Sequence, residues 1–281
     1  MEPVHVFYTP RQTALQHRGL SPSPGKPALV VAAWQELNLP MKIVEPQAAT
    51  LTDLCRAHDC GYVQGVLKGR LPNGFGHREP DLNDTLPWTV GSMISAADHV
   101  VITTEPAISP TSGFHHAGWD YGAAFCTFNG LMVAALTLHQ RGLVKRVAIV
   151  DLDQHFGDGT RDIIRRLRLD WVQHYTYGAR PATVDTAESW LAVLPAIVEE
   201  TIQGCDLVLY QAGVDPHVDD MFRGGLTTDQ LARRDQIVFR GCREAGVPLA
   251  VTLAGGYQRP VERVVDLHVS MFRRLVEVYW Q

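Results

Sequence analysis

The sequence predicts an α/β protein of three layers, with helices covering both faces of a central, mainly parallel sheet of about eight strands. Short apolar runs alternate with longer helical patterns along the chain, which indicates strand–helix–strand units with right-handed crossovers. The clearest runs, residues 147–150, 207–210 and 249–253, are apolar throughout, as is typical of strands buried on both faces.

The order of the elements follows from these patterns. We expect eight strands, at residues 4–9, 42–46, 99–103, 107–112, 146–152, 172–177, 207–212 and 249–254. Six helices are expected between them, at residues 27–37, 86–97, 125–140, 190–203, 228–244 and 261–279. The helix at 228–244 has clear end signals, because Thr227 and Thr228 precede it and Gly246 follows it. We find no internal repeat or linker, and interpret residues 1–281 as a single domain with long loops at 69–84 and 177–189.

Composition excludes several classes of protein. The apolar content of 46% excludes intrinsic disorder. With 25 Lys and Arg against 30 Asp and Glu, a net charge of −5 and no basic run, a nucleic-acid partner is not expected. No stretch of 18 apolar residues predicts a membrane span, and the first residues do not resemble a secretory signal. Five cysteines, odd in number and scattered, favour a cytoplasmic protein without a disulfide framework.

Unusual polar clusters follow four of the expected strands. Ligands of open α/β sheets bind outside the carboxyl ends of the strands, where the connecting loops meet. We therefore expect these clusters to share one site. They are Gly113-Phe114-His115-His116, Asp151-Leu152-Asp153-Gln154-His155-Phe156-Gly157-Asp158-Gly159, Gly213-Val214-Asp215-Pro216-His217 and Gly255-Gly256-Tyr257.

Alternation along an extended segment places Asp151, Asp153 and His155 on one side of the chain. Buried charges of this kind require a cation or a hydrogen-bond network. With Asp215 added, Asp153 and His155 give three metal ligands and leave room for water, the pattern of an open catalytic site. The pattern is short, and a capping role for Asp153 and His155 at the next helix remains an alternative.

The adjacent His115 and His116 suit acid–base chemistry if each is oriented by a carboxylate, for which Asp151 and Asp158 are available. A packing or capping role for the pair remains open. Tyr257, after two glycines, is either a loop tyrosine or a donor to a developing oxyanion.

In this order, the motifs resemble the zinc-dependent histone deacetylase superfamily, which has the arginase–deacetylase fold. The resemblance extends over nearly the whole chain through weaker matches at Tyr8-Thr9-Pro10 and His58-Asp59-Cys60-Gly61-Tyr62. The short chain and its Gly255-Gly256-Tyr257-Gln258 segment are most similar to small bacterial and class IV members.

The resemblance implies one Zn²⁺ per chain, bound by Asp153, His155 and Asp215. It also implies a structural K⁺ near Asp151 and Thr176.

The resemblance further assigns the catalytic and substrate-binding residues. His115 and His116 form the tandem pair, held by Asp151 and Asp158, with His116 as general base and then acid. Tyr257 polarises the acyl carbonyl, and Phe125 and Gly256 contact the acyl group. Residues 177–181 contain no Phe where many deacetylases place a second tunnel aromatic, so the shape of the acyl pocket stays open.

These assignments predict a hydrolase that removes an acetyl or other acyl group from an amine, such as an acetyl-lysine peptide, an acetylpolyamine or a small metabolite. One alternative is an arginase-like binuclear manganese ureohydrolase, although Asp215-Pro216-His217 lacks a second carboxylate two residues on. The other is a catalytically silent binding module on the same fold.

Overall fold

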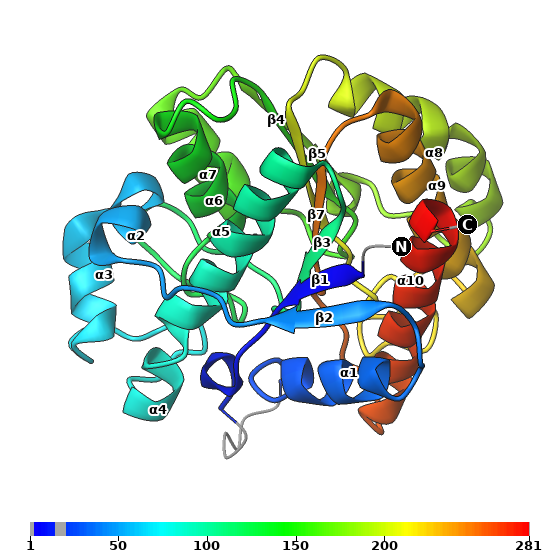
Figure 1. The fold of residues 1–281 in the computed structure, drawn as a ribbon. Helices are drawn as coiled ribbons and strands as arrows, with labels where there is room; N and C mark the ends of the chain where they lie inside the picture. Colours follow the sequence, from blue (N-terminus) through cyan, green and yellow to red (C-terminus); the bar gives the residue numbers. More distant parts are fainter. Residues whose placement is uncertain (1–2, 15–20, 281) are drawn as a thin grey trace.

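The structure is a computed structural model that describes residues 3–14 and 21–280, and its strands form one seven-stranded parallel sheet (Figure 1). The strands are β1 Val4–Phe7, β2 Met41–Val44, β3 Ala107–Ser109, β4 Val147–Asp151, β5 Val172–Thr176, β6 Leu207–Gln211 and β7 Leu249–Thr252. Their order across the sheet is β2-β1-β3-β7-β6-β4-β5. The predicted three-layer α/β class is confirmed, and the parallel arrangement extends to every strand pair of the described residues.

Ten α-helices are found in the described part of the chain. They are α1 Lys26–Gln35, α2 Leu51–Ala57, α3 Cys60–Leu67, α4 Pro80–Asn83, α5 Leu86–Thr103, α6 Gly130–Gln140, α7 Asp158–Leu167, α8 Ala187–Ile202, α9 Thr228–Ala245 and α10 Glu262–Trp280. Two short 3-10 helices, Pro10–Gln12 and Tyr177–Ala179, follow β1 and β5.

Side chains alternate between the two faces of the sheet, and each face has its own core. On β6, Leu207 and Leu209 join a core with helices α2, α3, α5, α6 and α7. Val208 and Tyr210 point the other way and pack with α1, α8, α9 and α10. The two groups of helices lie on opposite sides of the sheet in Figure 1, which gives the three layers.

The strand expected at residues 99–103 is wrong, because this segment is the last part of α5. A strand would place residues 100 and 102 on one face, but Val100 is fully buried and Ile102 is 68% exposed. Val100 instead continues the buried helical stripe of Met93, Ala96 and Ala97. This difference reduces the expected eight strands to seven.

Helix α6 begins later than the predicted residue 125. Asn129 is its N-cap and accepts a hydrogen bond from the backbone N–H of Met132 at 3.1 Å. Before it, Ala124 and Phe125 have φ angles of 44° and 70°, which a right-handed helix cannot contain. Phe125 therefore lies in a turn and not on the helix. Helices α2, α3, α4 and α7 are not among the six helices that the apolar patterns predict, although the alternative capping role of Asp153 and His155 implies a helix at the position of α7.

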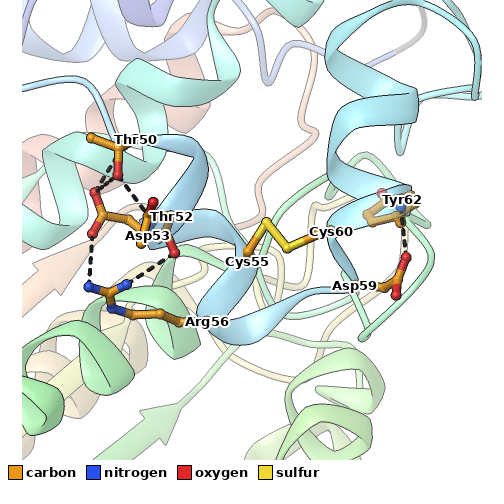
Figure 2. The surroundings of a disulfide bond; sticks show 8 residues. All are labelled: Thr50, Thr52, Asp53, Cys55, Arg56, Asp59, Cys60 and Tyr62. Atoms are coloured by element: carbon orange, nitrogen blue, oxygen red, sulfur yellow. Dashed lines mark hydrogen bonds and ion pairs between the residues drawn. A yellow bond between two sulfur atoms is a disulfide. The ribbon is translucent and has the colours of Figure 1, made fainter.

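A disulfide joins Cys55 of α2 to Cys60, the first residue of α3 (Figure 2). The sequence analysis expected no disulfide framework, and the structure pairs these two cysteines and leaves the other three free. The two helices are separated by a two-residue turn that brings the Cα atoms within 5.0 Å, which the odd total of cysteines could not indicate. Disulfides are rare in reducing compartments, so the cysteine content no longer supports the cytoplasmic assignment. Among the helices described, none combines the length and apolar character needed to cross a membrane.

Candidate active site

Four adjacent strands deliver their polar loops to one edge of the sheet. These strands are β3, β7, β6 and β4, which are consecutive neighbours in the sheet order. Parallel strands share the direction of their carboxyl ends, so the loops that follow them meet. The four polar clusters expected to converge lie on these loops.

Asp153, His155 and Asp215 are brought together at the centre of this edge. One ligand atom from each lies within 4.8 Å of the others. The Nδ1 atom of His155 is 3.1 Å from Oδ1 of Asp153 and 3.0 Å from Oδ2 of Asp215. Both carboxylates are buried, whereas His155 is partly exposed. Helix α7 is capped by Gly157 without a side-chain bond, so Asp153 and His155 do not cap it.

The surroundings of the two carboxylates fit a bound cation. Oδ2 of Asp215 is buried and, although Nδ1 of His155 lies 3.0 Å from it, forms no hydrogen bond within the described residues. Burial and the neighbouring charge of Asp153 raise the pKa of Asp215 to about 7. A Cβ atom on Gly255 would lie 2.5 Å from this Asp215 oxygen and 2.6 Å from Oδ2 of Asp153, so the backbone closes tightly around the carboxylates. A divalent ion would satisfy the free oxygen and offset the repulsion.

Backbone N–H groups fix the remaining carboxylate oxygens. Gly255 donates to Oδ2 of Asp153 at 2.9 Å, and Gln154 donates to Oδ1 of Asp215 at 3.1 Å. Each carboxylate is therefore oriented by a loop other than its own.

Two buried cationic residues, Arg234 and Lys26, donate hydrogen bonds to the backbone carbonyls of these loops. The sequence analysis did not identify either residue as part of the site. Arg234 of α9 is fully buried, donates to the carbonyls of Leu152 and Gly213, and pairs with Asp235 at 2.7 Å. Lys26 of α1 is fully buried and donates to the carbonyl of Ala254. In the sequence, each is simply a charged residue in a helix with an apolar face, and nothing in that pattern predicts that its side chain is buried.

Burial lowers the pKa of Lys26 to about 8, against the opposing effect of Asp215, Asp153 and Asp220. Arg234 and Lys26 thus place positive charge behind the carboxylate site and tie down the ends of β4, β6 and β7.

The tandem histidines each bind a carboxylate through Nδ1. His115 contacts Asp151 at 2.7 Å, and His116 contacts Asp158 at 2.6 Å. Their ring centroids are 4.1 Å apart. Both predicted pairs therefore have the expected partners.

The surroundings shift the pKa values of the two histidines in opposite directions. Burial alone would lower the pKa of His115, but the carboxylates of Asp151 and Asp153 outweigh it and raise the pKa to about 9. For His116, burial and the neighbouring His115 lower the pKa.

Asp151 and Thr176, the two residues expected near a potassium ion, are partners in the β4–β5 pairing. Asp151 is fully buried and also accepts from the side chain of Gln211 at 3.2 Å. The hydroxyl of Thr176 accepts from the N–H of Gly157 at 3.1 Å.

Tyr257 lies within a group of aromatic rings above the carboxylates. Its ring centroid is 6.0 Å from that of Phe125 and 5.1 Å from that of Phe222. Phe222 also packs edge-on against His155 at 4.5 Å, and Phe75 contacts Phe125 at 5.4 Å. Phe222 and Phe75 thus place two further aromatic rings beside Tyr257 and Phe125. The sequence analysis missed both, although Phe75 lies in the long loop at 69–84.

The loop that carries Tyr257 is held in place. The Tyr257 N–H donates to Oδ2 of Asp220 at 2.7 Å. Gly256 has a φ angle of 150°, and a Cβ atom there would lie 2.6 Å from Val214, so only glycine fits. Burial and the nearby Asp153 and Asp215 raise the pKa of Tyr257 well above its usual value, which keeps the phenol protonated.

Comparison with known proteins finds relatives over most of the chain. The chain is 29% identical over 265 residues to an uncharacterised protein of Picosynechococcus sp., covering 85% of this chain and 87% of that protein. It is 29% identical to histone deacetylase 2 of Arabidopsis thaliana, over 79% of this chain and 65% of that protein. It is 26% identical to a probable deacetylase of Methanothermobacter thermautotrophicus, over 58% and 51% respectively. The matches to the Arabidopsis and Methanothermobacter proteins therefore span less than two thirds of the length of each of those proteins.

Structure and family agree as well. The crystal structure of the HDA15 HD domain superposes with a TM-score of 0.82 at 17% identity, covering 99% of this chain and 91% of that one, which shows the shared fold. Residues 22–177, more than half of the chain, match the histone deacetylase domain. The chain therefore belongs to the histone deacetylase family.

Proposed function

We propose that this deacetylase-family protein is a zinc-dependent hydrolase that removes an acetyl or other acyl group from an acylated amine, either a lysine-like side chain or a polyamine. The observation that carries the proposal is the convergence of an Asp–His–Asp set, whose two carboxylates are buried, with two carboxylate-oriented histidines and Tyr257. In this proposal residues 1–281 act as one catalytic domain, which is supported by the single sheet that carries all four loops.

Asp153, His155 and Asp215 would hold the zinc ion. When bound, zinc supplies Lewis acidity, which polarises the acyl carbonyl and acidifies water. Asp151 and Thr176 would hold a structural K⁺ beneath the site, an arrangement that is supported by their adjacent positions on β4 and β5.

His116 would serve as the general base and then the general acid. Asp158 occupies its Nδ1 atom, so Nε2 is left to take a proton from the attacking water. As the carbon–oxygen bond forms and the amide carbon–nitrogen bond breaks, the same proton passes to the leaving amine. The lowered pKa of His116 favours its neutral form before the reaction. His115, fixed by Asp151 at 2.7 Å, would orient the pair.

Tyr257 would donate its phenolic hydrogen bond to that oxyanion, and its raised pKa ensures that it carries the proton. The rings of Phe75, Phe125 and Phe222 would enclose the acyl group, with the backbone at Gly256 beside it. Aromatic rings at this position would favour an apolar acyl chain.

The two alternatives receive less support. A binuclear ureohydrolase needs a further carboxylate two residues after Asp215, but the residue at that position is His217. Its Nε2 is engaged with Thr228 at 2.9 Å, and its Nδ1 accepts from the N–H of Asp219 at 3.0 Å. A silent binding module would be expected to lack ligands or the tyrosine, and every expected residue is present.

The test is a turnover panel of acetyl-lysine peptides, acetylpolyamines and longer acyl-lysines, measured on metal-free and zinc-loaded protein. We expect hydrolysis of at least one class with zinc and none after chelation. The relative rates will identify the amine and the chain length that the aromatic rings accept. A zinc-loaded protein that hydrolyses no member of the panel would contradict the proposal.

A further inference from the structure

A second group of potential metal ligands lies at the opposite, amino-terminal edge of the sheet. His5 is on β1, His99 is near the end of α5, and Glu105 is in the turn before β3. One ligand atom from each lies within 4.8 Å of the others, and the two imidazole centroids are 4.2 Å apart. The histidines are 94 positions apart in sequence, so no local pattern could have revealed the group.

Both imidazoles have a buried nitrogen with no hydrogen bond in the described part of the chain, namely Nδ1 of His5 and Nε2 of His99. An unsatisfied buried polar atom destabilises the folded protein, and most such atoms in native proteins find a partner. Two in one group, with their rings in contact and a carboxylate beside them, indicate a shared partner that protein atoms do not provide.

The backbone holds the carboxylate close to the histidines. Thr104 ends α5 with φ 64°, a left-handed conformation that is unfavourable for a β-branched residue. The next N–H, that of Glu105, donates to the hydroxyl of Thr103 at 3.2 Å. The turn reverses the chain between α5 and β3 and leaves Glu105 half-buried beside both rings.

We propose that His5, His99 and Glu105 bind a second Zn²⁺, distinct from the ion at the carboxyl edge. Two imidazoles and one carboxylate form a common ligand set for zinc, whereas calcium and magnesium prefer oxygen ligands alone. Tetrahedral zinc with ligands at about 2.1 Å separates its donors by roughly 3.4 Å. Side-chain movements of about 1 Å would therefore complete the site, and water would supply the fourth ligand.

The remaining charges near His99 are of both signs. Lys42 and Asp98 both act on His99 and are of opposite sign. Asp98 is also paired with Arg141 at 3.2 Å. Once bound, the ion would join β1, α5 and the start of β3, so its role would be to stabilise this edge of the sheet.

The test measures zinc per chain by elemental analysis after loading and desalting. We expect two ions in the wild-type chain, one in Asp215→Ala, one in Glu105→Gln and none in the double variant. Glu105→Gln preserves the shape of the side chain and removes only its charge. The matched control is Glu36→Gln, an exposed site distant in sequence, which should retain both ions.

The outcomes separate this inference from the proposed function. Loss of all zinc in Asp215→Ala alone, or unchanged zinc in Glu105→Gln, would overturn the second site. Titration of the Asp215→Ala protein with Co²⁺, followed by its visible absorption, provides a second measurement. We expect Glu105→Gln to weaken this binding by at least about 100-fold, since a direct ligand should matter more than the 10–100-fold effect of an indirect one.

Discussion

The two edges of the sheet use the same residue types in different settings. At the carboxyl edge, Asp153 and Asp215 are buried, and backbone N–H groups from neighbouring loops orient them. The buried cations Lys26 and Arg234 fix those loops from behind. At the amino edge, the three donors are only half-buried, and two of their nitrogens lack a hydrogen bond within the described residues.

The ligands at the carboxyl edge are therefore oriented by the protein itself, whereas those at the amino edge would be oriented by a bound ion. A catalytic centre needs ligands that are held in place before the substrate binds. The repulsion between its neighbouring carboxylates must also be offset in the unliganded protein. The carboxyl edge provides this through hydrogen bonds and buried cations. At the amino edge the described residues leave Nδ1 of His5 and Nε2 of His99 without a hydrogen bond, so the orientation of these two rings should depend on the bound ion itself.

The largest expected effect tests the carboxyl edge directly. Asp215→Ala removes one ligand and should reduce turnover to the metal-free background, because two remaining ligands cannot retain the ion. The substitution is best made in the Glu105→Gln background, where zinc analysis reports on a single site. Stoichiometric zinc in this double variant would contradict the assignment of Asp215.

Removal of a supporting cation is the next largest effect. Arg234→Met leaves the buried carboxylate of Asp235 without its cation and two loop carbonyls without a donor. Loss of one partner from a buried ion pair costs about 3–5 kcal/mol, which urea unfolding can measure. The matched control is Arg233→Met, whose side chain is exposed and pairs with the exposed Glu188. The control should have nearly the same free energy of unfolding as the wild type. If both variants lost the same free energy of unfolding, Arg234 would contribute no more to stability than a surface arginine, and its supporting role would be contradicted.

Tyr257→Phe tests chemistry without disturbing the ligands. It should leave zinc content unchanged and reduce kcat by roughly 10²-fold, the typical effect of losing one oxyanion donor. The aromatic ring stays, so contacts with Phe125 and Phe222 are preserved and KM should change little. Turnover equal to that of the wild type would show that Tyr257 has no part in stabilising the oxyanion.

The sequence reveals the carboxyl edge far better than the amino edge, for a physical reason. Apolar runs specify the strands. Because all strands point the same way, the loops that follow the four neighbouring strands β3, β7, β6 and β4 meet at one edge of the sheet. Phe222 completes the aromatic group from an irregular loop, where no periodicity predicts its direction. Arg234 looks like an ordinary helical charge until the packing of α9 shows that it is buried. His5 and His99 meet only because α5 crosses β1, and such long-range packing leaves no local signature.

The smallest expected effect concerns the disulfide, which lies furthest from the chemistry. Cys55 and Cys60 flank His58, whose buried ring contacts the carbonyl of Gly118 and accepts from the N–H of Asn129, at the two ends of the loop that carries Phe125.

We expect three thiols to react in the unfolded, unreduced protein and five after reduction, because the other three cysteines are unpaired. Reduction, or the paired change Cys55→Ser with Cys60→Ser, should lower the free energy of unfolding by about 2 kcal/mol, since the closed loop is short. Zinc content and kcat should remain within about twofold of the wild type, because the disulfide constrains the unfolded chain more than the folded site. A large loss of zinc or turnover would instead show that the supports of the carboxyl edge extend as far as α2 and α3.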